Sequence, residues 1–416
     1  MFQSLSSITY PVADLAQARH WYSKVLNREP VLESPLAAVF AVGNCMLGLL
    51  ASAAAPAPFR EGPVAYWSVD DIDAAWQRLL DFGASPQCEM YFSSSGARMA
   101  RVTDPFGTVL GLTGRASAAT PRTLQDQPSD SALGVALWRA IAAQEAREEI
   151  RGSDTLADAF LNDDFRRLVA NPAACEWLMQ NVPGNYEFFL ARTAWLDDAV
   201  RDALESSTPQ IVFLGAGYDS RAYRFRHLVR GTRIFELDIA PTQRRKRNCL
   251  QQAGIPVPEQ MTFVPIDFTR DRFEDVLTAA GFDPGLRTLF VWEGVTYYLP
   301  AEAVDRTLDF VRTNSPAGSL LCFDYLADAP DMMDRYGVKA AMTAMQTAYL
   351  AEPVKFRIPE GTIEAFLSAR GYAVIEHLTD KEIEKKYLTL RDGSLAGRAL
   401  ACFRLVKASA GAAPAR

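Results

Sequence analysis

The sequence predicts an α/β protein in two parts, in which a smaller α+β domain of two βαβββ repeats precedes a doubly wound, mostly parallel sheet. Three observations predict this. An internal repeat lies within residues 1–114, residues 115–130 are rich in small and turn-forming residues, and strand-like and helix-like runs alternate after residue 209. With 416 residues, 49% of them hydrophobic, the chain is long enough for two separate cores.

The composition indicates which kinds of binding partner and which cellular compartment to expect. The formal charge of −7 comes from interspersed acids and bases, without the basic block of a nucleic-acid-binding or membrane-surface protein. No run reaches the ~18 apolar residues of a membrane span, and the first residues lack a signal-peptide pattern. The six cysteines are scattered, with no C-x-x-C, as is typical of reduced thiols. We therefore expect a cytoplasmic protein whose partners are small molecules or peptides, with no nucleic acid and no membrane.

The first domain repeats itself at an offset of 57 residues, because PVADLAQA at 11–18 corresponds to SVDDIDAA at 68–75. Each copy begins with strand-like residues and continues with an aspartate suited to capping a helix. An amphipathic helix of about ten residues and further short strand patterns follow. The predicted unit is therefore βαβββ, present twice in residues 1–114, with residues 115–130 as a linker.

The second domain, residues 131–416, begins with helical sequence at 131–208 and continues with a Rossmann-like core at 209–408. Alternating strands and helices predict a sheet that binds ligands at the carboxyl ends of its strands. Residues 325–360 interrupt the alternation and are predicted to form a cap, whose four methionines could line a pocket or form ordinary helix core. Strands are predicted at 210–214, 233–238, 261–266, 288–292, 319–324, 372–378 and 399–406.

A glycine-rich turn follows the first of these strands. In IVFLGAGYDSRAYRF, residues 211–225, Gly215, Ala216 and Gly217 lie between a strand and a helix, which brings backbone close to a nucleotide-like ligand. Ser220 stands where a dinucleotide site would have glycine, and Asp219 would repel a pyrophosphate at the helix start. A phosphate-free ligand fits better, and S-adenosylmethionine is such a ligand.

Acidic residues end the next three strands along the chain. Glu236 and Asp238 end the second strand, Asp267 ends the third with Phe268 beside it, and Glu293 ends the fourth. A single acid of this kind could be a helix cap or a loop residue. Four of them at consecutive strand ends favour a binding site, because carboxylates there lose solvent without evident partners.

Four blocks of this domain, LGAGYDSRAYRF, FELD, ARTAWLDD and WEGVTYYLPAEAVDRTLDFV, resemble the leucine carboxyl methyltransferase family over residues 130 to 408. The resemblance implies a Rossmann-like, S-adenosylmethionine-dependent methyltransferase with an extra N-terminal helical segment. It also implies the following cofactor contacts: Arg192 for the methionine carboxylate, Gly215 and Gly217 beneath the cofactor with Ala216 and Asp219 in the same turn, Asp238 for the ribose with Glu236 near it, Asp267 and Phe268 for adenine, and Glu293 for the amino group. Alternatively, Arg192 is a surface residue of a helix that pairs with Asp197.

Methyl transfer is an in-line displacement, to which an enzyme contributes mainly by aligning the acceptor with the methyl group and by excluding water. A carboxylate acceptor is already ionised at neutral pH, whereas a hydroxyl benefits from a general base. Tyr297 and Tyr298 follow Glu293 and are candidates for contacting or orienting the substrate. His377 is a candidate catalytic residue near the cap, with a structural role as the alternative.

The first domain, with YPVADLAQARHWYSKVLN and DPFGTVLGL, resembles the vicinal oxygen chelate superfamily of glyoxalases, extradiol dioxygenases and bleomycin-resistance-type proteins. Ser7, Val64 and Gly111 occupy the positions at which enzymes of that superfamily place metal ligands. Valine and glycine side chains offer no donor, so we expect no metal. Such domains often pair across a two-fold axis, so we expect a homodimer. Four aromatic residues could form the wall of a ligand site or belong to the core: Tyr10, Trp67, Tyr91 and Phe92.

Together these observations predict an S-adenosylmethionine-dependent O-methyltransferase that acts on a carboxylate or hydroxyl of a specialised metabolite, such as a natural product, or of a peptide. The first domain would aid substrate binding or dimerisation. The alternative is a small-molecule binding or sequestration protein with a vestigial methyltransferase domain.

Overall fold

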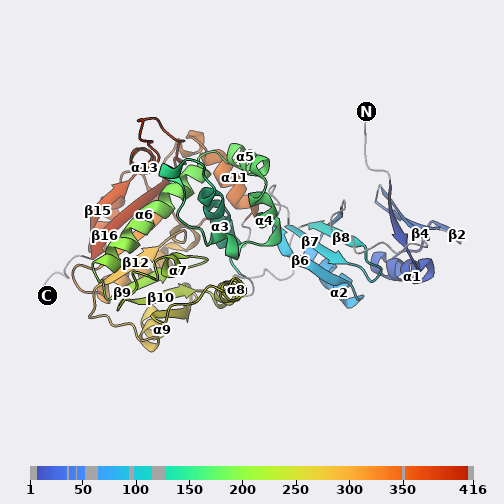
Figure 1. Ribbon diagram of the computed structural model, residues 1–416, viewed down its shortest axis with the longest axis horizontal. Coiled ribbons are helices and arrows are strands. Elements are labelled where there is room, and N and C mark those ends of the chain that lie inside the picture. Colours follow the sequence, from blue (N-terminus) through green and yellow to red (C-terminus); the bar gives the residue numbers. More distant parts are fainter. Residues whose placement is uncertain are drawn as a thin grey trace. The chain divides into compact units, whose positions relative to one another are not determined.

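The computed structural model describes residues 7–34, 37–43, 45–51, 64–92, 98–114, 128–348 and 352–410. The chain separates into two compact units, Met1–Pro121 and Arg122–Arg416 (Figure 1). The boundary falls within the predicted linker, whose residues 115–127 lie outside the described residues.

Unit 1 contains the predicted βαβββ arrangement twice. The first copy comprises β1 (Ser7–Val12), α1 (Leu15–Leu26), β2 (Leu32–Ser34), β3 (Ala37–Val42) and β4 (Cys45–Ala51). The second comprises β5 (Ala65–Val69), α2 (Ile72–Asp81), β6 (Ser85–Phe92), β7 (Arg98–Thr103) and β8 (Val109–Gly114). The two sheets have the equivalent orders β1-β4-β3-β2 and β5-β8-β7-β6. Asp14 and Asp71 cap α1 and α2 by accepting hydrogen bonds from backbone N–H groups, as the repeat predicts.

The two copies in unit 1 share one hydrophobic core. The Tyr22 hydroxyl of the first copy donates to Asp104 Oδ2 of the second at 2.8 Å, and Trp21 Nε1 donates to the carbonyl oxygen of Phe82 at 2.7 Å. Tyr10 belongs to this core, and Trp67 packs against it. The side chains of Tyr91 and Phe92 lie outside the described residues.

Unit 2 is built on a doubly wound sheet with the order β11-β10-β9-β12-β13-β16-β15. Its strands are β9 (Gln210–Leu214), β10 (Arg233–Asp238), β11 (Met261–Pro265), β12 (Thr288–Trp292), β13 (Leu320–Asp328), β15 (Tyr372–Leu378) and β16 (Phe403–Ala410), with β14 (Ile358–Pro359) beside β13. All neighbours in the sheet pair in parallel except β16, which is antiparallel to both β13 and β15. Every residue of the central strands β9 and β12 is buried, as expected for parallel strands covered on both faces.

The last strand begins later than residue 399, where the sequence predicted it. The backbone N–H of Leu400 donates to the carbonyl oxygen of Gly184 at 3.1 Å, and that of Ala401 to Tyr336 at 3.3 Å. These tertiary contacts hold the residues before Phe403 outside the sheet, although their apolar side chains resemble those of a strand.

The helices of unit 2 precede, connect and cover the strands. α3 and α13 pack against α6, and α6 contacts β12 (Figure 1). The helices are α3 (Asp130–Ala143), α4 (Asp163–Val169), α5 (Pro172–Asn181), α6 (Asn185–Glu205), α7 (Arg221–Arg224), α8 (Ala240–Gln252), α9 (Phe273–Ala279), α10 (Ala301–Thr313), α11 (Val338–Ala348), α12 (Ile363–Ser368) and α13 (Asp380–Tyr387). Across the described part of the chain, no helix combines the length and apolar character needed to cross a membrane.

The cap region contains α11 and a short turn of 3₁₀ helix at Met332–Asp334. Met332 and Met342 are buried in the core of unit 2, and Met345 packs against that core. Met333 is 46% exposed. The methionines therefore serve mainly as core residues, which was one of the two interpretations of the sequence.

Candidate cofactor site

The glycine turn after β9 has the geometry of a ligand-binding turn. Gly215 and Gly217 have φ values of +75° and +49°, which favour glycine. A Cβ added to Gly215 would lie 2.5 Å from Cγ2 of Val295. The N–H of Ala216 donates to the backbone of β10, and the N–H of Gly217 donates to Asp238 Oδ2 at 2.6 Å. The turn is therefore held against the carboxyl ends of β10 and β12.

Asp238 lies at the carboxyl end of β10, where the sequence predicted the ribose contact. Its second carboxylate oxygen accepts from the N–H of Ile239 at 2.7 Å. Burial raises the pKa of Asp238 to about 6, although these two backbone hydrogen bonds oppose the rise. An acceptor fixed in this way fits a pair of ribose hydroxyls.

Glu236 lies two residues earlier on the same face of β10 and forms a buried ion pair. Its Oε2 atom is 2.7 Å from Nζ of Lys246 on α8, and both side chains are 1% exposed. Burial raises the pKa of Glu236 to about 7, against the opposing effect of Lys246. Glu236 therefore has a structural role next to the site, because Lys246 already neutralises its charge.

A cluster of buried charges connects α6, the glycine turn, the end of β12 and the middle of β13. Arg192, on α6, lies 2.6 Å from Asp324 on β13 and 3.1 Å from Glu293. Glu293 Oε2 also lies 2.7 Å from Nη1 of Arg221, which forms a further ion pair with Asp197 at 2.8 Å. Arg192 is completely buried, so the alternative of a surface arginine paired with Asp197 is wrong.

Two atoms of this cluster retain unused hydrogen-bonding capacity. Among the described residues, buried Nη2 of Arg192 has no hydrogen-bond partner, and buried Oε1 of Glu293 has only its ion-pair contact with Nε of Arg192 at 3.1 Å, which lacks hydrogen-bond geometry. Burial alone would raise the pKa of Glu293, but the nearby guanidinium groups of Arg221, Arg192 and Arg139 lower it to about 2. A neighbouring cationic donor and anionic acceptor fit the carboxylate and ammonium groups of an amino acid, which S-adenosylmethionine carries.

Asp219, predicted as a cofactor contact, pairs within the protein. Its carboxylate accepts from the backbone N–H of Arg221 at 2.7 Å and forms an ion pair with the guanidinium of the same residue. Asp219 therefore orients Arg221 toward Glu293. Sequence reasoning missed Arg221 and Asp324, although Arg221 stands in the glycine-turn block and Asp324 ends the strand predicted at 319–324, which in the structure continues to Asp328.

Asp267 and Phe268 follow β11, the neighbour of β10. Oδ1 of Asp267 accepts from the backbone N–H and the hydroxyl of Thr269 at 2.8 and 2.6 Å, so the carboxylate also stabilises the local turn. Phe268 is buried and packs edge-on against Phe273. Both residues follow the carboxyl end of β11, next to the end of β10 where Asp238 lies, and their contact with adenine stays a prediction.

Sequence comparison identifies the relatives of unit 2. Residues 132–312 match the leucine carboxyl methyltransferase family. A Streptomyces avermitilis relative, named "Putative S-adenosyl-L-methionine-dependent methyltransferase", is 30% identical over 255 residues, which cover 60% of this chain and 86% of the relative. The chain belongs to the leucine carboxyl methyltransferase family. A Bacillus subtilis relative with the same description, YktD, is 29% identical over 206 residues, 50% of this chain and 67% of the relative. This chain is therefore an S-adenosylmethionine-dependent methyltransferase, and S-adenosylmethionine is its cofactor.

A crystal structure of a Thermobifida fusca protein, also described as a methyltransferase, is 16% identical to this methyltransferase. It covers 69% of this chain and 96% of its own, with a TM-score of 0.46. Residues 4–112 match the glyoxalase, bleomycin-resistance protein and dioxygenase superfamily, so unit 1 is a domain of the type that its repeat predicted.

The positions of unit 1 that correspond to metal ligands offer few donors. A Cβ added to Gly111 would lie 2.5 Å from the ring of Tyr66, so this ring covers the position. Val64 is half-buried, and the side chain of Ser7 lies outside the described residues. Among the residues that the structure describes, no group of three or more His, Cys, Asp or Glu side chains could hold a metal ion.

The three predicted catalytic residues of the methyltransferase lie in two different places. Tyr297 and Tyr298 form a turn just after β12, beside Glu293, with their ring centroids 4.7 Å apart. His377 lies on the edge strand β15, and its Nε2 atom is 3.2 Å from the hydroxyl of Tyr325. Successive residues of β13 point to opposite faces of the sheet, Asp324 toward Arg192 and Tyr325 toward His377. The structure therefore brings both tyrosines, but not His377, to the cofactor residues.

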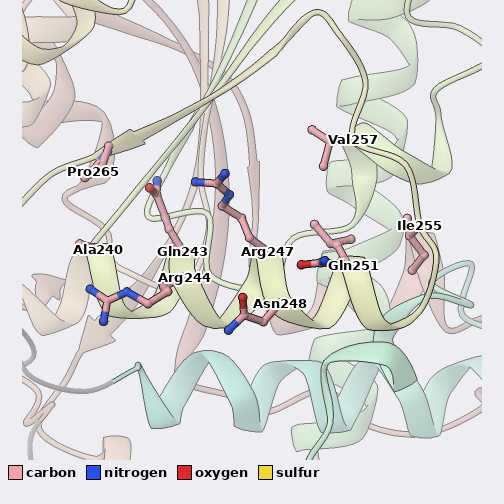
Figure 2. A pocket seen from close by; sticks show the side chains of 10 residues that line it. Ala240, Gln243, Arg244, Arg247, Asn248, Gln251, Ile255, Val257 and Pro265 are labelled. Atoms are coloured by element: carbon pink, nitrogen blue, oxygen red, sulfur yellow. The ribbon is translucent and has the colours of Figure 1, made fainter.

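An open groove of about 540 Å³ lies beside these residues, between α8 and the chain that leads into and along β11 (Figure 2). Ala240 and Pro265, at one end of the lining (Figure 2), are two positions from the predicted cofactor contacts Asp238 and Asp267. None of the predicted cofactor contacts lines the groove itself. Gln243 and Arg247 extend from α8 toward the facing chain, and Arg244, Asn248 and Gln251 also line the groove (Figure 2). Of the predicted cofactor residues, Arg192, Asp219 and Glu293 are held together through the ion pairs described above.

Proposed function

We propose that this methyltransferase transfers the methyl group to an oxygen atom, and specifically to a carboxylate of a specialised metabolite or peptide. The observation that supports this proposal is the shortage of a free general base among the described residues around the glycine turn. Asp219 and Glu293 are paired with Arg221. Burial raises the pKa of Tyr297 well above its usual value, so this phenol stays neutral. His377 lies on the other face of the sheet.

Two further acids titrate closer to neutrality but are already engaged. Asp238 accepts from two backbone N–H groups, and Glu236 pairs with Lys246. A hydroxyl acceptor would need one of these groups to remove its proton, whereas a carboxylate acceptor is already a nucleophile at neutral pH. Because these acids are already paired, we infer that the methyl acceptor is a carboxylate.

S-adenosylmethionine, when bound, would supply the methyl group for transfer to the acceptor oxygen. The protein contributes position and exclusion of water. Arg192 and Glu293 would hold the amino-acid end of the cofactor, and Asp238 would hold the ribose. Asp267 and Phe268 would hold adenine, which leaves the end of β12 as the approach for the acceptor.

We propose that unit 1 assists by dimerisation or by binding the acceptor. Support comes from its first sheet, where Met46 and Leu50 on β4 are 43% and 46% exposed and Leu32 on β2 is 56% exposed. A second copy or an apolar acceptor would remove these side chains from water. Sedimentation velocity of the full chain and of Leu50→Glu tests the first role, which is refuted if the wild type sediments as a monomer.

The acceptor class is tested by incubating the purified protein with methyl-labelled S-adenosylmethionine and an extract of its own host. A methyl ester loses its label in mild alkali, so we expect the labelled product to be base-labile. An inactive Asp238→Asn protein is the matched control for background labelling. Label that survives alkali would show an ether or N-methyl product and would refute the carboxylate assignment, while leaving the methyltransferase activity itself established.

A further inference from the structure

Two segments of unit 2 that are far apart in sequence meet over the cofactor residues. The first is the start of α3, where Ala132 Cβ lies 3.0 Å from the position that a Cβ on Gly217 would take. The second is the chain at 352–356, which precedes β14. Its residues Lys355 and Phe356 donate backbone hydrogen bonds to the carbonyl oxygen of Tyr297 at 2.7 and 3.2 Å. One segment therefore covers the glycine turn, and the other covers the turn after β12.

Glu352 joins these two segments. Its carboxylate accepts from the hydroxyls of Ser129 and Ser131 at 2.9 and 3.0 Å and from the backbone N–H of Ser131 at 2.9 Å. Ser129 is the N-cap of α3, and its own N–H donates to the Thr242 hydroxyl on α8 at 3.0 Å. Glu352 is only 8% exposed. Charge-assisted hydrogen bonds of a buried carboxylate are stronger than neutral ones, so this residue connects the two segments firmly.

Glu352 also lies close to the predicted ribose contact. Its negative charge is one of the influences that raise the pKa of Asp238, after burial. The side chain therefore belongs to the surroundings of the predicted cofactor site.

We propose that Glu352 is a positioning residue that keeps the start of α3 and the 352–356 segment closed over the bound cofactor. The product S-adenosylhomocysteine can leave only after this connection opens. Because the proposal concerns the cofactor alone, it does not depend on which acceptor the enzyme methylates.

The test is the dissociation rate of S-adenosylhomocysteine from the full-length protein, measured by stopped-flow tryptophan fluorescence. For Glu352→Ala we expect dissociation about tenfold faster or more, the equivalent of losing one charge-assisted hydrogen bond. Glu352→Gln retains an acceptor oxygen and should restore most of the slow dissociation. Glu205→Ala, at an exposed position near the end of α6, is the matched control and should dissociate at the wild-type rate.

A purely structural role for Glu352 would lower the urea midpoint of unfolding without changing the dissociation rate, and that result would overturn the proposal. If Glu352→Ala does not fold, Ser129→Ala/Ser131→Ala removes the two hydroxyl donors and keeps the glutamate. Faster dissociation from this double variant would support the proposal, and an unchanged rate would refute it. Both measurements use S-adenosylhomocysteine without acceptor, so a wrong assignment of the acceptor would not affect them.

Discussion

Replacing Glu293 by glutamine should selectively weaken the binding of the amino-acid part of the cofactor. Glu293 lies between Arg192 and Arg221, and its Oε1 atom, 3.1 Å from Nε of Arg192, accepts no hydrogen bond from the described residues. We expect this atom to accept from the cofactor's ammonium group. Each arginine retains another carboxylate in the variant, Asp324 for Arg192 and Asp197 for Arg221, so the fold should persist.

The expected loss of affinity for the cofactor product follows from the loss of one hydrogen bond between charged groups. Such a bond contributes about 1.5–3 kcal/mol. Since about 1.4 kcal/mol corresponds to a tenfold change, the Kd for S-adenosylhomocysteine should rise roughly 10- to 150-fold. Isothermal titration calorimetry at neutral pH measures this directly, because three nearby arginines outweigh the effect of burial, lower the pKa of Glu293 to about 2 and keep the wild-type group ionised.

5′-Methylthioadenosine provides the internal control, because it has the same adenosine and sulfur but no amino-acid group. Glu293→Gln should bind it as tightly as the wild type does. Asp238→Asn should lose affinity for both ligands, since both contain the ribose. If Glu293→Gln weakened both ligands equally, the effect would come from a distorted glycine turn. An unchanged affinity for S-adenosylhomocysteine would show that Glu293 does not contact the amino group.

Three further predictions concern pH and stability. Cofactor affinity should rise as the pH passes upward through about 6, the value to which burial raises the pKa of Asp238, because only the ionised carboxylate accepts from both ribose hydroxyls. Calorimetry across this range checks it, and Asp238→Asn should flatten the profile. Lys246→Met leaves buried Glu236 without its cation and should cost about 3–5 kcal/mol in urea unfolding, most of it recovered in Lys246→Met/Glu236→Leu. A left-handed backbone conformation costs a non-glycine residue about 1–2 kcal/mol. Gly215→Ala should lower the free energy of unfolding by more than this, because the new methyl group would lie 2.5 Å from Cγ2 of Val295. Gly254→Ala, with φ of +64° and open space, should lose only that backbone part, and equal losses would contradict the steric argument.

Local pattern was sufficient to predict most strands of unit 2. The strand at 210–214 has the predicted bounds, and the strand predicted at 233–238 does too. Continuous apolar runs bounded by turn residues predict buried parallel strands well, because their burial depends little on the identity of the neighbouring strand. The strand predicted from residue 399 was less accurate, because the backbone of Leu400 bonds instead to Gly184, which lies far away in the sequence.

The sequence by itself determined the two-part organisation, the repeat of unit 1, the glycine turn and the acids at the strand ends of unit 2. These features depend on short stretches whose residue types suit one local conformation. Only the tertiary structure decided which charges meet: that Arg221 and Asp324 complete the cluster around Glu293, that Glu352 reaches the start of α3, and that His377 lies elsewhere. The physical reason is that ion pairs depend on strand order and on the face to which a side chain points. Contacts between residues that lie far apart in the sequence set both of these.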